Sequence, residues 1–359
     1  MQCGIIGLPQ AGKTTLFRML TRLPARESHS HAGAQHIGVV HVLDDRLDRL
    51  SKLFTPLKTT YATMECVDVA AIGKDTLKES TYLGNLRNMD ALAHVVRLFP
   101  DESVPHLKGS IDPQRDISSV ELDLILADLG VIENRLTKLE KERKKIKNPE
   151  FEKETALLER AQKWLETEKP LREVEWDEEE KKRLRGFLFL SEKPMLLVLN
   201  VGEEAVGKMD EVLQSVGLDQ LGRHPNSRAM VVSAKVEAEL AEMSDAEAEE
   251  FRKSYGLRES GLERLTRTIN ELLGRIVFFT VSEKECRAWS IPKNTSAQQA
   301  AGAIHTDLMN HFIRAEVIPW DTLLEQGGFP AARQAGLVRL EGKGYIVQDG
   351  EIVHIRHSG

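Results

Sequence analysis

The stretch GLPQAGKTT, residues 7–15, fits the pattern G-x-x-x-x-G-K-[ST] of phosphate-binding loops. In such a loop, backbone N–H groups and the N-terminus of the following helix bind the negative charge of the phosphates. Lys13 would reach the β- and γ-phosphates, and the Thr14 hydroxyl would be a ligand of Mg²⁺. The predicted nucleotide-binding residues of the loop are Gly7, Leu8, Pro9, Gln10, Ala11, Gly12, Lys13, Thr14 and Thr15.

A carboxylate that could share the metal follows in the apolar stretch VDVA, residues 67–70. Asp68 ends a predicted strand there, and a carboxylate is a natural second contact to Mg²⁺, usually through water. The competing interpretation is an ordinary residue of a strand-end turn. Because a P-loop precedes it, we favour the metal role and predict Mg²⁺ as a cofactor held by Thr14 and Asp68.

The nucleotide base should be read in the segment LNVGEE, which follows another apolar strand. An Asn-x-x-Asp motif there would indicate guanine, because a short carboxylate accepts from the guanine N1–H and 2-amino group. This chain has Asn200 and Val201 followed by Glu203, whose side chain is one methylene longer, so we predict ATP as the nucleotide with GTP less favoured. The base would be backed at the next strand end by Ser233, Ala234 and Lys235.

Strands and helices must bring these motifs together, and the pattern of apolar residues predicts where those strands and helices lie. QCGIIG, the loop and TTLFRMLTRL predict strand, loop and helix, which is the context that a P-loop requires. Further strands are predicted at GVVHVLD, ATMECVDVA, MDALAHVVRLF, PMLLVLNV and RAMVVSA. With the helix DDRLDRLSKLF between two of them, the order indicates an α/β fold, a P-loop NTPase domain with a mainly parallel sheet.

A charged segment, residues 116–183, interrupts this pattern, and about half of its residues are charged against 29% in the whole chain. Apolar residues at steps of four and three form a coiled-coil seam, and Asn148-Pro149 then predicts the start of a second helix. The seam residues are Ile125, Leu129, Ile132, Leu136 and Leu139. We predict an inserted helical hairpin, whose basic run KERKKIK is either a solvated helix face or an RNA contact.

The pattern changes again from Arg275 onward. FFTVSEKECRAWSI predicts two strands about a polar turn, TSAQQAAGAIHTDL a helix, and GYIVQDGEIVHIR a hairpin turning at Asp349-Gly350. These elements make a small α+β domain. The predicted domains are residues 1–115 with 184–274 for nucleotide binding, 116–183 for the hairpin, and 275–359 for the C-terminal domain.

Composition limits the setting in which the protein works. With 49 basic and 56 acidic residues, the net charge of −7 argues against a general nucleic-acid coat, and we expect no sequence-specific DNA binding. The three cysteines, Cys3, Cys66 and Cys286, are widely spaced and look like free thiols of a reducing compartment. No apolar stretch is long enough for a membrane helix, and no signal peptide is recognisable, so we expect a cytoplasmic protein without a membrane partner.

Together, GLPQAGKTT, VDVA, NVGE and SAKVEAELAEM, with the helical insertion, resemble the YchF family of Obg-related P-loop ATPases. The tail RAWSIPKNTSAQQAAGAIHTDLMNHFIRAEVI, continued by LEGKGYIVQDGEIVHIR, is similar to the TGS-like, β-grasp (ubiquitin-like) region of that family. The resemblance covers essentially the whole chain. It implies a weak ATPase that associates with the ribosome or another translation component and regulates translation or the stress response.

The resemblance also implies where hydrolysis would occur. A glutamine orients the attacking water in Ras-like proteins, whereas the matching residue here is Ile72, which cannot do so. YchF-like proteins share this replacement and use a histidine of a mobile loop, which PHLKGSIDP places at His106. A neutral imidazole can accept a proton from water or hold it in line. The alternative is a surface-loop histidine without a role.

Three residues depart from the family pattern near the γ-phosphate. The family's D-x-A-G glycine is Ala71, its switch threonine falls at Ala32, and the usual P-loop asparagine is Gln10. Ser28 or Ser30 could replace the threonine only if the loop were shifted. None of these changes touches the base site, so we expect binding to be retained better than switching and hydrolysis to be reduced.

Other histidines of the chain are candidate metal ligands by their spacing. The tract SHSHAGAQH carries His29, His31 and His36, and a His-rich tract can bind Zn²⁺. No cysteine or carboxylate stands at ligand spacing nearby, so a switch loop is the favoured interpretation. His305 and His311 are six residues apart, do not share a helix face well and are expected to be structural.

Two rival functions remain beside the weak ATPase. The chain could be a nucleotide-responsive adaptor that binds ATP or GTP and has lost efficient hydrolysis, with Ala32 and Ala71 as the cause. A small-molecule kinase would also use a P-loop, but the Asn-x-x-Glu and Ser-Ala-Lys motifs argue against it, and no arginine-rich lid is recognisable.

Overall fold

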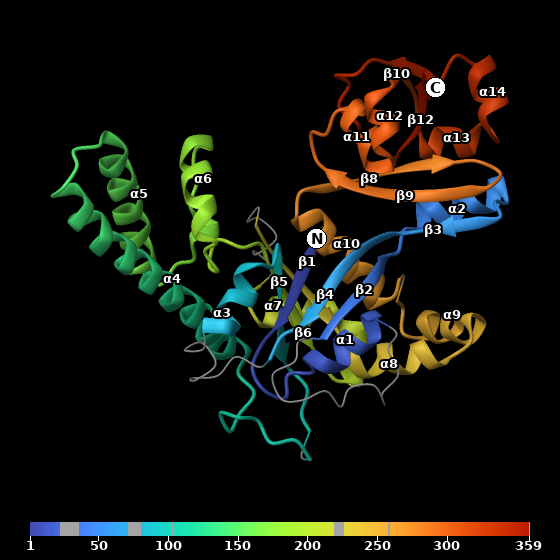
Figure 1. Cartoon of the computed structure of the whole chain (residues 1–359). Coiled ribbons are helices and arrows are strands. Elements are labelled where there is room, and N and C mark those ends of the chain that lie inside the picture. Colours follow the sequence, from blue (N-terminus) through green and yellow to red (C-terminus); the bar gives the residue numbers. More distant parts are fainter. Residues whose placement is uncertain (22–35, 71–79, 102, 219–225, 258, 359) are drawn as a thin grey trace. The chain divides into compact units, whose positions relative to one another are not determined.

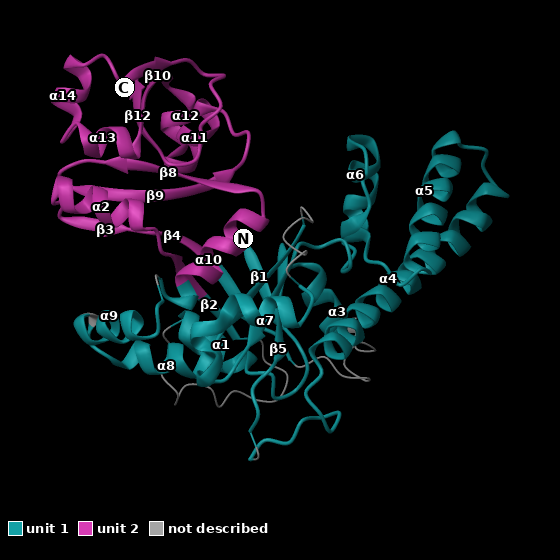
Figure 2. Cartoon of the chain, turned by 180° about the vertical axis from the view of Figure 1, so that it is seen from behind, with its two compact units in different colours: residues 1–38, 65–262 teal, residues 39–64, 263–359 magenta. Residues whose placement is uncertain are grey.

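The computed structural model describes residues 1–21, 36–70, 80–101, 103–218, 226–257 and 259–358. The chain divides into two compact units, which are coloured separately in Figure 2. The first comprises residues 1–38 and 65–262, and the second comprises residues 39–64 and 263–359. Residues 39–64 therefore group with the C-terminal segment, although their sequence carries no sign of it.

The first sheet has the strand order β2-β4-β1-β5-β6-β7, and β4, β1, β5, β6 and β7 pair in parallel (Figure 1). Every residue of β5 and β6 is buried, as expected of apolar strands covered on both faces. The predicted α/β class is confirmed. The strands are β1 Gln2–Ile6, β2 His36–Val42, β4 Ala62–Asp68, β5 Ala91–Arg97, β6 Met195–Asn200 and β7 Ser227–Val232.

Helices follow these strands at the expected places, and parallel pairing brings the carboxyl ends of the strands to one edge of the sheet. A short 3₁₀ helix, η5, spans Glu203–Lys208 after β6. The helices of this part are α1 Lys13–Thr21, α3 Ser80–Arg87, α7 Met209–Ser215, α8 Ala234–Glu242 and α9 Asp245–Ser254. Helix α10, Gly261–Leu272, belongs mostly to the second unit, which begins again at residue 263.

The predicted hairpin consists of α4 Pro113–Arg143 and α5 Pro149–Leu165 (Figure 1). Asn148 caps α5 by accepting a hydrogen bond from the Glu150 N–H, as its position before a proline predicted. The seam residues pack into one apolar cluster with α5, and short elements complete it: η3 Leu171–Glu173, α6 Glu178–Leu184 and η4 Arg185–Phe187. The fully buried seam residues are Ile125, Ile132 and Leu139, and their buried partners in α5 include Leu158, Ala161 and Leu165.

The second unit contains a mixed sheet of order β11-β10-β12-β8-β9-β3. The predicted pair of strands is present as β8 and β9, and β12 lies parallel to β8 and antiparallel to β10. The strands are β3 Lys58–Thr60, β8 Arg275–Val281, β9 Glu285–Pro292, β10 Phe312–Pro319, β11 Arg339–Glu341 and β12 Glu351–His357. The helices are α2 Asp45–Phe54, α11 Ala297–Ile304, α12 Thr306–Asn310, α13 Trp320–Glu325 and α14 Phe329–Gln334.

The single helix expected between residues 295 and 308 is divided in two. Ser296 caps α11 through a capping box, but His305 adopts an extended conformation and its side chain caps α12. The expectation that His305 is structural agrees with this contact, since its Nδ1 accepts from the Asp307 N–H.

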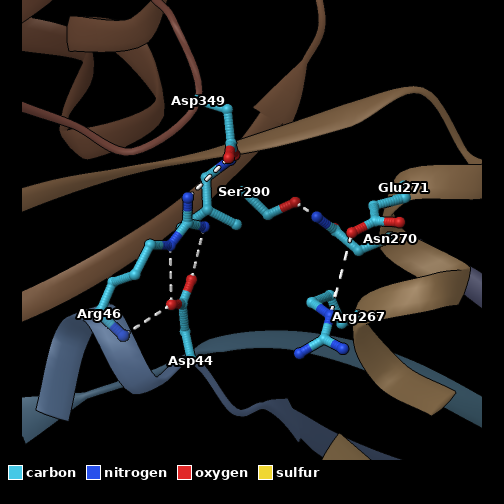
Figure 3. Close-up of polar contacts among 8 residues, drawn as sticks. Asp44, Arg46, Arg267, Asn270, Glu271, Ser290 and Asp349 are labelled. Atoms are coloured by element: carbon cyan, nitrogen blue, oxygen red, sulfur yellow. Dashed lines mark hydrogen bonds and ion pairs between the residues drawn. The ribbon is translucent and has the colours of Figure 1, made fainter. Parts of the chain in front are cut away.

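The hairpin predicted at residues 344–356 is wrong, because Asp349-Gly350 does not join two paired strands. The Asp349 carboxylate accepts from the Val277 N–H and from Arg46, whose guanidinium also binds Asp44 (Figure 3). The residues before the turn bond to the start of α11 instead, at Thr295 and Ala297. Local turn chemistry was recognised correctly, but long-range partners took the residues that a hairpin would have paired.

Among the described residues, no helix combines the length and apolar character needed to cross a bilayer.

Candidate nucleotide-binding site

The phosphate loop connects β1 to α1, and its backbone requires glycine at two positions. Gly7 has a φ of 144°, and a Cβ there would lie 2.4 Å from the Val95 carbonyl oxygen. Gly12 has a φ of 96°, and a Cβ there would lie 2.2 Å from the Asn200 side-chain nitrogen. A side chain at either residue would therefore force the loop away from the neighbouring strand ends.

Lys13 is the first residue of α1 and only 7% exposed. Its Nζ donates to the Leu8 carbonyl oxygen at 2.9 Å, so the ammonium lies within the loop that it would serve. Burial lowers the pKa of Lys13 to about 8, and the nearby charge of Asp68 acts in the opposite direction. An anion at the loop would supply the charge partner that this desolvated cation needs.

The two predicted metal ligands touch each other. The Thr14 hydroxyl donates to a carboxylate oxygen of Asp68 at 3.0 Å. Burial raises the pKa of Asp68, against the opposing effects of the Thr14 hydrogen bond and the Lys13 charge. Both side chains offer oxygen, which Mg²⁺ prefers, so these residues fit the predicted ion.

Asn200 joins the phosphate loop to the base-backing segment. Its side-chain nitrogen donates to the Ala11 carbonyl oxygen, and its side-chain oxygen accepts from the Ala234 N–H, each at 3.0 Å. Ser233 caps α8 by accepting from the Val236 N–H. Three predicted segments from distant parts of the sequence are thus connected by buried hydrogen bonds.

These groups border a cavity of about 880 Å³ at the carboxyl edge of the sheet, which we call the nucleotide cavity. Of the predicted residues, Gly7, Leu8, Pro9, Ala11, Asp68, Ser233 and His106 are absent from its described lining. The predicted residues that line it are Gln10, Gly12, Lys13, Thr14, Thr15, Asn200, Val201, Glu203, Ala234 and Lys235. Gln10 adopts a φ of 63°, a left-handed conformation that asparagine accepts more readily than glutamine.

Glu203 begins η5 at the base end of the cavity. One carboxylate oxygen accepts from the Tyr255 hydroxyl at 2.8 Å, and the other lies 3.8 Å from Lys235 Nζ. The hydrogen bond to Glu203 raises the pKa of Tyr255. No sequence motif predicted this tyrosine, which lies 52 residues away along the chain.

His106 lies in the loop between β5 and α4, in contact with the first turn of α4. Its Nε2 is 3.0 Å from a carboxylate oxygen of Asp116, and its Nδ1 accepts from the Lys108 N–H. Both ring nitrogens are therefore engaged, and only 8% of the side chain is exposed. Asp116 also binds Arg115, which in turn donates to Ser110.

The beginning of the same loop has a different anchor, which the sequence motifs did not include. Arg97 at the end of β5 is 4% exposed and donates to the carbonyl oxygens of Phe99 and Asp101. Its guanidinium also lies over the Phe99 ring, 4.6 Å from the centroid. Phe99 and Asp101 line the nucleotide cavity, so Arg97 fixes part of its wall.

Several predicted residues lie outside the described part of the chain, namely Ser28, His29, Ser30, His31, Ala32, Ala71 and Ile72. The described part contains no cluster of three or more histidine, cysteine or acidic residues suited to a metal ion. Cys3, Cys66 and Cys286 are free, as predicted, and all three are buried. Burial raises the pKa of the Cys66 thiol to about 12, which makes it a poor nucleophile.

Comparison with known proteins bears on this site. A protein named "Ribosome-binding ATPase YchF" from Bacillus subtilis is 39% identical over 100% of this chain and 99% of its own length. Its namesake from Escherichia coli O157:H7 is 36% identical over 98% of each chain. This chain belongs to the YchF family.

Two further matches agree with membership of the YchF family. The family model described as YchF-GTPase_C, protein of unknown function (DUF933), matches residues 275–358. The solved structure titled "Structure of the Schizosaccharomyces pombe YchF GTPase" superposes with a TM-score of 0.85 at 28% identity. That match covers 99% of this chain and 97% of the other, so it extends across both units.

Proposed function

We propose that this YchF-family protein binds Mg·ATP and hydrolyses it slowly. The observation that carries the proposal is the nucleotide cavity. Among the residues that line it, Lys13 and Asn200 donate hydrogen bonds to carbonyl oxygens of the phosphate loop, and Thr14 donates to Asp68. The base motif has Glu203 three residues after Asn200, where a guanine-binding site would have the shorter aspartate. This difference supports adenine over guanine as the bound base. GTP is the less favoured nucleotide.

Each group has a distinct part in the proposed reaction. The loop N–H groups and Lys13 stabilise negative charge on the β- and γ-phosphates. Thr14 and Asp68 would hold Mg²⁺, which supplies neutralisation of the phosphate charge when it is bound. His106 positions the attacking water and accepts its proton through a ring nitrogen.

Slow turnover follows from the contacts of His106. A histidine that donates from Nε2 to Asp116 and accepts at Nδ1 has no nitrogen left for water. We propose that His106 must leave Asp116 before it can act, which makes the motion of this loop part of the reaction.

The partner is proposed from the names of the relatives, which are called ribosome-binding. We propose that hydrolysis is coupled to the ribosome or another translation component and serves regulation of translation or the stress response. The location would then be cytoplasmic. The C-terminal segment would be the TGS-like region, and the division into three domains remains a proposal.

The test measures nucleotide binding and phosphate release by the full chain. We expect Mg·ATP to bind at least about tenfold tighter than Mg·GTP, which corresponds to 1.4 kcal/mol. We also expect slow phosphate release that increases when ribosomes are added. Normal ATP binding with undetectable turnover, both alone and with ribosomes, would contradict the enzymatic half of the proposal.

The adaptor is the second candidate, and the contact between His106 and Asp116 favours it if that contact never opens. Equal background turnover of wild type and His106→Ala would then be expected. A clear loss of turnover in His106→Ala would exclude the adaptor.

A further inference from the structure

The carboxylate of Glu203 is held from outside the nucleotide cavity. The Tyr255 hydroxyl donates to one of its oxygens at 2.8 Å, but Tyr255 is not among the described residues that line that cavity. Glu203 and Glu204 line both this cavity and a second hollow, which Tyr255, Gly207 and Lys208 also border. The hydrogen bond therefore ties one carboxylate oxygen of Glu203 to a residue of the second hollow.

The position of the tyrosine hydroxyl is set by packing. Tyr255 directly follows α9 and caps its C-terminus, and its ring stacks on Phe251 with centroids 4.7 Å apart. The ring also packs against the apolar cluster formed by Val206, Val236, Leu240 and Ala248. A ring held in this way has little freedom, so the hydroxyl is a fixed donor rather than one that follows Glu203.

The hydrogen bond matters because of where Glu203 stands in the base motif. A free carboxylate at the base would accept from the guanine N1–H and 2-amino group, whereas adenine offers an acceptor at N1 and would be repelled. In this structure one carboxylate oxygen of Glu203 accepts from the Tyr255 hydroxyl, and the other lies 3.8 Å from Lys235 Nζ, so neither oxygen is without a partner.

We propose that Tyr255 is a positioning residue that determines nucleotide specificity by occupying an acceptor oxygen of the Glu203 carboxylate. It disfavours guanine by removing the acceptor that guanine would need, and it spares adenine from an opposing carboxylate. This inference rests on the proposed function, since it concerns the adenine preference of the same site.

The test uses Tyr255→Phe in the full chain, which removes the hydroxyl and keeps the packed ring. Calorimetric titration with Mg·ATP and Mg·GTP would measure both dissociation constants. We expect Mg·GTP to bind about three- to tenfold tighter than in wild type, and Mg·ATP to change by less than about twofold, as for loss of one charge-assisted hydrogen bond.

Two further variants separate the effect from general loss of a tyrosine hydroxyl. Tyr61→Phe is the matched control, because the Tyr61 hydroxyl also donates to a carboxylate, that of Asp48 in the other unit. It should leave both affinities unchanged. The double variant Glu203→Gln with Tyr255→Phe should lose the gain in Mg·GTP affinity, because the amide has no negative charge and only one acceptor oxygen.

The outcomes distinguish the inference from the proposed function. An ATP preference in wild type that stays unchanged in Tyr255→Phe overturns the inference alone. A gain in Mg·GTP affinity that survives Glu203→Gln also overturns it, since the gain would not come from this carboxylate. A wild type that binds GTP as tightly as ATP overturns the proposed adenine preference, and the inference falls with it.

Discussion

The two candidate functional regions of the first unit, the phosphate loop and the loop before α4, differ in the hydrogen-bond partners of their side chains. At the phosphate loop, Lys13, Thr14 and Asn200 each bond within the segments that would surround the nucleotide. In the loop before α4, His106 bonds to Asp116 and Lys108 instead, outside the described lining of the cavity.

This difference follows from the elements that carry the residues. The binding groups stand at the ends of paired, buried strands and at the start of α1, where few alternative positions exist. His106 stands in a connecting loop whose beginning is fixed by Arg97 and whose end is fixed by the first turn of α4. The binding groups are therefore fixed by the sheet, whereas His106 is held by a contact with α4 that, under the proposed function, must open before hydrolysis.

The largest effect is expected at the binding end. Lys13→Ala removes a buried cation that phosphate would pair, and we expect the dissociation constant of Mg·ATP to rise at least about 100-fold. Calorimetric titration measures this directly. Lys284→Ala, an exposed lysine of the second unit, serves as the control and should bind normally. Binding of Lys13→Ala within threefold of wild type would remove the P-loop assignment.

The next effect concerns the hydrolysis end. His106→Ala should lower phosphate release about 30-fold, somewhat less than the effect of a fully available general base, because His106 must first leave Asp116. The dissociation constant of Mg·ATP should stay the same, since His106 does not line the described cavity wall. A parallel loss of binding would mean that the two regions are not separate.

A third effect probes the proposed metal ligands Thr14 and Asp68 at the binding end. Thr14→Val keeps the shape of the side chain but removes the hydroxyl bonded to Asp68. In wild type, Mg²⁺ should lower the dissociation constant of ATP, and we expect this lowering to be about tenfold smaller in the variant. Titration of ATP with and without a chelator measures it. If wild type and variant respond equally to the chelator, Thr14 is not a metal ligand.

The comparison also explains how far the sequence could lead. The P-loop, the strand ends and the seam of the hairpin depend on short-range patterns, so their positions were predictable. The partners of individual side chains were not: Asp116 for His106, Tyr255 for Glu203 and Arg46 for Asp349. Such pairs form only when packing brings distant segments together, and the sequence pattern of each segment is compatible with many partners.

Misplaced expectations have the same physical cause. Asp349-Gly350 has the composition of a hairpin turn, yet its carboxylate binds Val277 and Arg46 from other parts of the chain (Figure 3). Residues 39–64 look like one strand and helix of a P-loop domain, yet β3 pairs with β9 of the C-terminal segment. Local propensity identified the elements, and long-range pairing decided where they belong.

The smallest effect tests the contact between His106 and Asp116, which holds His106 against α4. Asp116→Asn keeps the size of a side chain that is 4% exposed but weakens its hold on the His106 Nε2–H, because the acceptor loses its charge. His106 would leave more often, and we expect about threefold faster phosphate release with unchanged ATP binding. The double variant with His106→Ala should return to the rate of His106→Ala alone. Slower release in Asp116→Asn would instead mean that the carboxylate orients the imidazole for catalysis, and that the contact with α4 serves hydrolysis rather than restraining it.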